Sequence, residues 1–147
     1  MKNVMFKLLL GVSMVLSANL VSAKEDRPYS DGPVTDVSFI RTKSGMFDEY
    51  MKWIATSRKQ LMEEEKKAGI ITDYKVYFVE PRNPGDPDII LCETFANMAA
   101  FDGLDDRLDA VTEKVEGSVK KSNEAAIDRD KLRTVLGSEL IREMVLK

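Results

Sequence analysis

The sequence predicts an α+β fold in which four strands and two helical regions follow the order β-α-β-β-α-β. Along four short segments, apolar residues occupy every second position, as in strands. In the segments between the first and second and between the third and fourth of these, apolar residues recur with a period near 3.6, as in helices. A segment dense in proline, glycine and aspartate separates the two middle strands. The chain has a single cysteine, Cys92, so no internal disulfide can form and the fold must depend on the burial of apolar side chains.

The first strand is predicted at residues 34–42, where side chains alternate between two faces. Ser44 is then expected to cap a helix that runs to about Ala68, and Gly69 suits the position just after the helix end. One side of this helix carries apolar residues and one arginine at helical spacing: Phe47, Tyr50, Met51, Ile54, Arg58 and Leu61.

The two middle strands are predicted at residues 70–80 and 88–95, which are rich in β-branched and aromatic residues. The segment between them, PRNPGDP at 81–87, cannot pair as a strand. Because this loop is short, the two strands are expected to form a hairpin.

The last third of the chain predicts helices followed by a closing strand. Asn97 can cap a short helix, and residues 105–136 are compatible with a helix that is interrupted at Gly117 and Ser118. Gly137 is expected to end the helical region, and residues 138–146 return to alternation.

This order is the split βαβ, or ferredoxin-like, plan, in which both helices cover one face of a four-stranded antiparallel sheet. Both sides of the hairpin are apolar: Ile71, Tyr77 and Val79 alternate with Tyr74, Val76 and Phe78. A large exposed apolar sheet face is unusual for a monomer, so a second copy is expected to cover it. The predicted assembly is a homodimer that forms an α/β barrel.

Three segments resemble the dimeric α/β-barrel superfamily over about residues 34–147: VSFIRTKSGMFDEYMKW, DYKVYFVEPRNPGDPDIILCETF and RTVLGSELIREM. Small members of that superfamily include cofactor-free antibiotic-biosynthesis-type monooxygenases and NIPSNAP-like proteins. The resemblance implies a cavity between sheet and helices in each subunit, but it does not imply one activity. Haem-binding branches generally use a histidine ligand, and this chain has no histidine.

The N-terminal residues read as a targeting segment. In residues 1–23, two lysines precede an apolar run and Val21-Ser22-Ala23 matches a signal-peptidase site, which predicts export to the periplasm or secretion. An N-terminal membrane anchor is the alternative, although the apolar run is short for a bilayer. Residues 24–33 are predicted as a flexible linker and residues 34–147 as a single domain, with no membrane insertion after cleavage.

Composition excludes several classes of function. The absence of histidine removes Ser-His-Asp catalysis and the usual ligand for zinc, copper or haem, and neither a metal site nor a cofactor is expected. Acidic residues number 25 against 22 basic ones, so nucleic acid is not an expected partner.

The candidate ligand-binding residues are aromatic residues and arginines within apolar patterns: Tyr50, Trp53, Arg58, Tyr74, Tyr77 and Arg142. Aromatic rings could hold a flat ligand, or they could simply form core and dimer contacts. An Arg–Glu pair could hold a carboxylate or phenolate, or it could only neutralise buried charge.

The sequence therefore predicts an exported homodimeric domain that binds a small apolar or aromatic molecule, with no reaction assigned. One alternative is a cofactor-independent monooxygenase or isomerase acting on an aromatic or polycyclic substrate. Another is a non-catalytic interaction module of the cell envelope.

Overall fold

The structure is a computed structural model that describes residues 27–147, so the predicted signal peptide and residues 24–26 lie outside the described part. Ten elements follow one another along the chain: β1 (Tyr29–Thr42), α1 (Phe47–Trp53), the π-helical turn η1 (Ile54–Arg58), α2 (Lys59–Lys67), β2 (Asp73–Phe78), β3 (Ile89–Phe95), the 3-10 turn η2 (Met98–Phe101), α3 (Leu104–Glu116), α4 (Val119–Arg129) and β4 (Arg133–Leu146).

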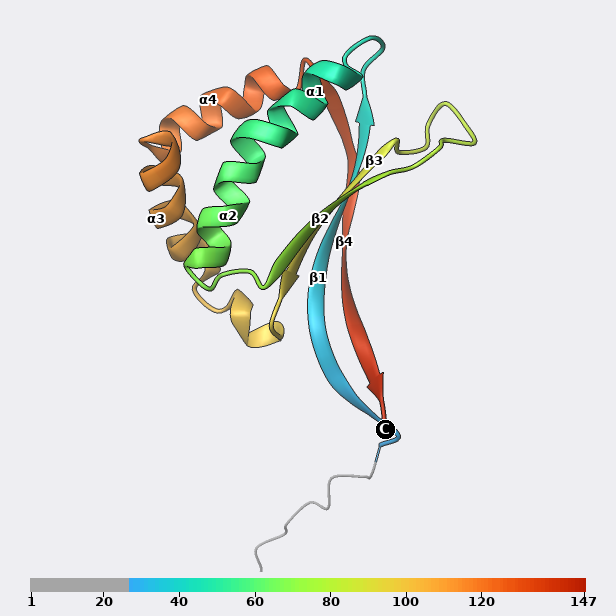
Figure 1. Ribbon diagram of the computed structural model, residues 1–147, viewed down its shortest axis with the longest axis vertical. Helices are drawn as coiled ribbons and strands as arrows, with labels where there is room; N and C mark the ends of the chain where they lie inside the picture. The colour runs from blue at the N-terminus through green and yellow to red at the C-terminus, as the bar shows by residue number, and fades with distance from the viewer. Residues whose placement is uncertain (1–26) are drawn as a thin grey trace, which may run out of the picture.

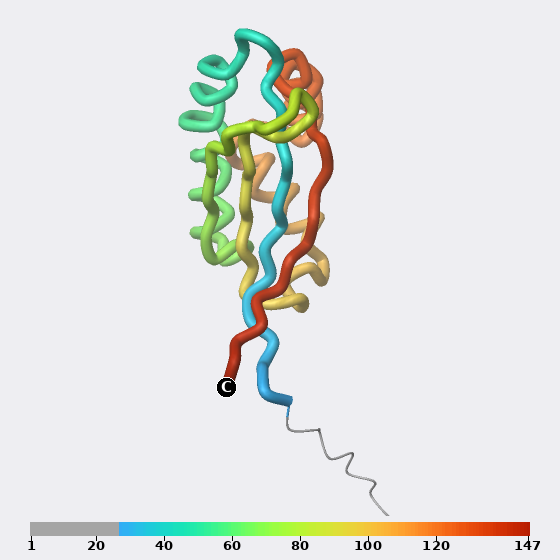
Figure 2. Tube along the Cα trace, turned by 90° about the vertical axis from the view of Figure 1, so that its right-hand side faces the viewer, coloured from blue at the N-terminus to red at the C-terminus, as the bar shows by residue number. Residues whose placement is uncertain are grey.

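The four strands form one antiparallel sheet in the order β2-β3-β1-β4. The helices lie on one face of this sheet and leave the other face open (Figure 1). Figure 2 views the sheet from its helix-free side, with the helices behind the strands. This arrangement confirms the predicted ferredoxin-like α+β fold.

The core lies between the helices and the sheet and has two clusters. The first contains Ile40, Tyr50, Ile54, Ile89 and Leu91, and the second contains Met62, Ile70, Ile71, Phe95 and Val111. Both clusters join residues from the helical region to residues of β1 or β3, so burial fixes the continuous helix α1-η1-α2 over the centre of the sheet.

Strands β1 and β4 are each 14 residues long and extend past β2 and β3 as a two-stranded ribbon (Figure 1). Tyr29 pairs with Leu146 at the end of this ribbon. The first strand therefore begins five residues before the predicted start at Val34, and residues 29–33 are strand rather than flexible linker.

Two predicted boundaries differ at the helices. The first helix begins at Phe47 with Met46 at its N-cap and no side-chain hydrogen bond there, so Ser44 is not its cap. At the other end of the chain, residues 133–136 belong to β4 and Gly137 lies inside that strand instead of ending a helix.

A β-bulge explains the second difference. Val135 pairs with Ile40 and Gly137 pairs with Phe39, which leaves Leu136 as the extra residue. The bulge places two apolar residues in succession, and together with Leu132 they imitate helical spacing in the sequence. Because residues 133–135 pair with β1, this segment forms a strand and not a helix.

Other local predictions are confirmed. The Asn97 side chain accepts a hydrogen bond from Ala99 N at the start of η2. The helical region after it breaks at Gly117 and Ser118, between α3 and α4. No helix in residues 27–147 is long and apolar enough to cross a membrane.

Candidate functional site

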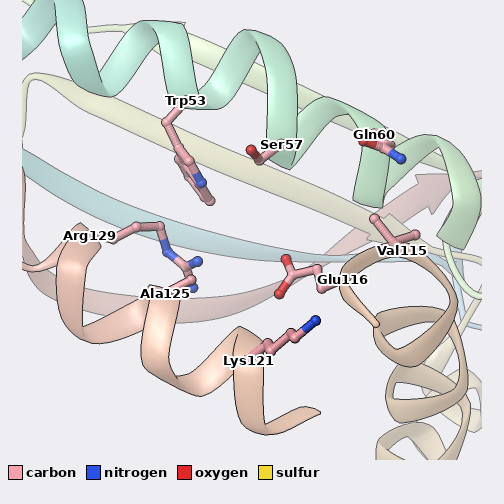
Figure 3. Close-up of a pocket in the computed structure, with 8 residues that line it drawn as sticks. All are labelled: Trp53, Ser57, Gln60, Val115, Glu116, Lys121, Ala125 and Arg129. Atoms are coloured by element: carbon pink, nitrogen blue, oxygen red, sulfur yellow. The ribbon is translucent and has the colours of Figure 1, made fainter. Parts of the chain in front are cut away.

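A cleft separates the first helix from α4 (Figure 3). It has two lobes, of about 250 Å³ and about 490 Å³, which share the lining residues Trp53, Ser57, Ala125 and Arg129. The smaller lobe extends toward the corner between α3 and α4, and the larger one extends toward Leu132. Because four residues line both lobes, we treat them as one site, the helix cleft.

Trp53 and Arg129 line the helix cleft and belong to a stack that continues into the core through Tyr50 and Arg133. The Arg129 guanidinium lies over the Trp53 ring at 4.7 Å from its centroid, and Figure 3 shows the indole pointing from α1 toward Arg129. Trp53 stacks on Tyr50 with 5.6 Å between centroids and 16° between planes. Arg133 lies over the Tyr50 ring at 5.6 Å, and its Nη1 donates to the Tyr50 hydroxyl at 3.1 Å.

Both arginines carry buried donors without acceptors. The Nε atoms of Arg129 and Arg133 are buried, and neither finds a hydrogen-bond partner in the described chain. Burial, and then the nearby charge of Arg133, lowers the pKa of Arg129. Two neighbouring cations that share no acidic partner within residues 27–147 make this end of the cleft suited to an anion.

A second polar group lies deeper, between the helices and the sheet. Arg58 on η1 is 6% exposed and binds Glu93 of β3, with 2.6 Å between Nη2 and Oε1. Burial raises the pKa of Glu93, while Arg58 opposes that rise. Burial also raises the pKa of Asp36, which is paired with Glu93 across the sheet.

Glu65 of α2 completes this interlayer cluster. Its side chain is 4% exposed, and its Oε2 atom has no hydrogen-bond partner among the described residues. Burial, reinforced by the charge of Glu93, raises the pKa of Glu65 to about 7. Glu65 does not line the helix cleft, so the two polar groups are separate features.

The structure places the six predicted site residues in five different surroundings. Trp53 lines the helix cleft and stacks on Tyr50, which is fully buried and lines neither lobe, whereas Arg58 lies in the interlayer cluster. Tyr74 donates to Glu63 Oε1 at 2.5 Å, and Arg142 pairs with Asp31 at 3.2 Å on the ribbon: neither lines the cleft.

Tyr77, the sixth of these residues, is on the helix-free face of the sheet. It pairs with Ile90, whose neighbours in β3 point their side chains toward the helices. Its side chain therefore cannot contribute to a site in the helix cleft of the same subunit. A ligand role for Tyr77 would need a different site.

Sequence reasoning missed the α4 side of the helix cleft. Lys121, Ala125 and Arg129 are spaced four residues apart, so they share one face of α4. That spacing is visible in the sequence, but it gains meaning only when this face is seen opposite Trp53. The sequence feature that could have indicated this side of the cleft is a small residue, Ala125, between two basic residues on one helix face.

Within residues 27–147, no three His, Cys, Asp or Glu side chains are grouped so that they could hold a metal ion. No protein-family model matches the chain, and no curated protein matches it.

Two solved structures are similar in fold. HapK from Hahella chejuensis aligns with a TM-score of 0.49 and 12% identity, over 75% of this chain and 91% of HapK. Protein SO0527 from Shewanella oneidensis aligns with a TM-score of 0.47 and 13% identity, over 80% of this chain and 96% of SO0527. Because both TM-scores lie below 0.5, neither similarity bears on the function of this chain.

Proposed function

We propose that this chain is a small-molecule-binding domain that holds an aromatic ligand in the helix cleft. The observation that carries the proposal is the exposed side of the Trp53–Arg129 stack inside a cleft whose larger lobe measures about 490 Å³. Ligand pockets commonly have volumes of a few hundred Å³ and combine apolar walls with a few polar groups. The indole supplies the flat apolar wall, and Ser57 and Gln60 supply polar groups beside it.

The function we propose includes a homodimer. Tyr77 and Ile141 lie on the helix-free face and are 47% and 51% exposed, and half-buried Phe39, Ile90 and Cys92 lie on the same face. An apolar face of this kind favours pairing with a second sheet. The edge strand β4 adds exposed Val145, which shares the face of Ile141, to the surface that a partner would cover.

Export remains part of the proposal on the strength of residues 1–23 alone. A basic start, an apolar run and a small-residue cleavage site are the features of a secretory signal. Periplasmic or secreted protein would begin at Lys24, and N-terminal sequencing of the mature chain would identify that residue.

Catalysis is not included in the function we propose. Glu65 has the pKa of a general base near neutrality, but it does not line the helix cleft. The monooxygenase or isomerase alternative and the envelope interaction module stay predictions.

Nitrogen-15 NMR of the full domain tests the ligand-binding proposal, with neutral 2-naphthamide as the probe. The chain has one tryptophan, so a single indole N–H signal reports on the helix cleft. We expect the probe to shift this signal and the backbone signals of Ser57 and Ala125. The backbone signal of Lys75, on the helix-free face, serves as the control. Shifts confined to residues outside the cleft, or no shifts at millimolar probe, would overturn the proposal.

A further inference from the structure

We propose that the helix cleft selects aromatic carboxylates, which it binds with the ring against Trp53 and the carboxylate on Arg129. This inference rests on the proposed function, because it specifies the class of ligand for the same cleft. The Arg129 guanidinium, which lines both lobes, supports it together with the nearby charge of Arg133.

Arg129 has donors that no residue of the described chain uses. A guanidinium has five N–H donors and can bind both oxygens of a carboxylate. The Arg129 side chain makes no hydrogen bond or ion pair with residues 27–147, and it lines both lobes of the helix cleft. Its Nε is buried, so the Nη groups are the donors that a carboxylate in the cleft would reach.

Arg133 lies four residues after Arg129, at the start of β4, and lines neither lobe of the helix cleft. It donates to the Tyr50 hydroxyl through Nη1. Burial lowers the pKa of Arg129, and the charge of Arg133 lowers it further. An anion bound to Arg129 would relieve this repulsion between the two cations.

The acidic residues near Arg129 leave its guanidinium without an ion pair in the described chain. Asp128 lies on the same helix as Arg129 but is occupied by Lys131, with 2.7 Å between Oδ1 and Nζ. Glu116 and Asp130 act on Arg129 through their charges without forming an ion pair, and Glu49 lines the larger lobe. The Arg129 guanidinium is therefore not paired with a carboxylate of residues 27–147.

The ring of the ligand would lie against the aromatic wall of the cleft. The Arg129 guanidinium covers one part of the Trp53 indole, which stacks on Tyr50. A flat ring that enters the cleft contacts the indole, Ala125 and Leu132, and its carboxylate then reaches Arg129. A neutral aromatic molecule would gain the ring contact alone.

Calorimetric titration compares 2-naphthoate with 2-naphthamide, which share the ring and differ in charge. We expect 2-naphthoate to bind about tenfold more tightly than 2-naphthamide. Only the carboxylate accepts charge-assisted hydrogen bonds from the Arg129 guanidinium. We expect Arg129→Met to remove this preference while 2-naphthamide affinity changes by less than about twofold. Arg133→Met should also reduce it.

Lys120→Met is the matched control, because it removes a positive charge from the same helix at a side chain that is 85% exposed and does not line the cleft. It should leave the preference intact, and circular dichroism checks that each variant folds. Equal binding of the two probes would overturn the carboxylate inference and keep the proposed function. Binding of neither probe would overturn both. Tighter binding of 2-naphthyl phosphate than of 2-naphthoate would overturn the carboxylate assignment alone.

Discussion

Glu65 is the residue whose burial has the clearest consequence for stability. Its carboxyl lies between α2 and the sheet, near Glu93 and Arg58, and one of its oxygens lacks a donor within the described chain. Glu65 and Glu93 thus share the Arg58 guanidinium, and the charge of Asp36 also acts on Glu93. Arg58 is paired with Glu93, so a proton on the buried Glu65 is favoured in the folded state.

We expect Glu65→Gln to flatten the dependence of stability on pH. The folded pKa of Glu65 is about 7, above its usual 4.5, so its contribution to stability is greatest below pH 4.5 and is lost as the pH rises toward 7. Glutamine resembles the neutral carboxyl at every pH. The variant should lie within about 1 kcal/mol of the natural protein at pH 5 and exceed it at pH 8 by roughly 2 to 3 kcal/mol of unfolding free energy.

Chemical denaturation at the two pH values measures this difference. Glu113→Gln makes the same change at an exposed carboxyl of α3 and should leave the pH dependence as it is. If the curves of Glu65→Gln and the natural protein run parallel from pH 5 to pH 8, then Glu65 is ionised throughout and our account of its burial is wrong.

The sequence predicted some residues of the helix cleft and missed others for a physical reason. Trp53 stood out because it lies at the edge of an apolar helical stripe, where a side chain is half-buried. Arg129 and Arg133 read as ordinary surface charges, because their importance comes from α4 lying opposite α1. Contacts between elements distant in sequence are not encoded in local periodicity.

At the scale of elements, the corner between α3 and α4 shapes one end of the helix cleft. Gly117 adopts a φ of +85°, a left-handed conformation that glycine tolerates best. Ser118 follows as the N-cap of α4 and accepts from Lys121 N at 3.2 Å. These two residues turn the chain so that Glu116 and Lys121 line the same lobe.

We expect Gly117→Ala to lower the unfolding free energy by about 1 kcal/mol, because alanine is strained at positive φ. A Cβ at Gly117 would meet Lys121 Nζ at 3.6 Å, an ordinary contact, so strain in the backbone and not a clash is the cause. Urea denaturation measures the change. Gly85→Ala, in an open loop without positive φ, should change stability by less than about 0.5 kcal/mol. Equal effects of the two substitutions would contradict the assignment.

The order of the elements could be predicted because each element has its own periodicity of apolar residues. The residues at which the elements begin and end were harder to predict. The break at Gly117 and Ser118 follows from residue type, since glycine ends a helix and serine begins one. The start of β4 at Arg133 depends on pairing with β1. The bulge at Leu136 interrupts the alternation of apolar residues, so the sequence of this strand resembles that of a helix. The same pairing draws residues 29–33 into β1, although their composition suits a linker.

For the whole molecule, the two faces of the sheet differ in what covers them. On the helix side, Ile40, Ile89 and Leu91 are buried in the first core cluster. On the other side, no described element covers Tyr77 or Ile141. The helices of residues 27–147 cover one face, so the proposed dimer covers the second face with another copy.

Sedimentation velocity tests this expectation with Tyr77→Asp. A dimer should form at micromolar concentration in the natural protein. The substitution would bury a charge in the interface, so it should raise the dimer dissociation constant by about tenfold or more. Tyr77 belongs to neither core cluster and is half-exposed, so the subunit itself should stay folded by circular dichroism.

Ile127→Asp provides the matched control, because Ile127 is 68% exposed on α4, in the helical layer on the opposite side of the sheet. It adds the same charge at an exposed apolar residue and should leave the dimer intact, since a sheet-to-sheet interface excludes the helices. A natural protein that sediments as a monomer would contradict the dimer, and a dimer weakened by Ile127→Asp and not by Tyr77→Asp would place the interface elsewhere. In either case the exposed sheet face would need another partner, because a large exposed apolar face is unusual on a monomer.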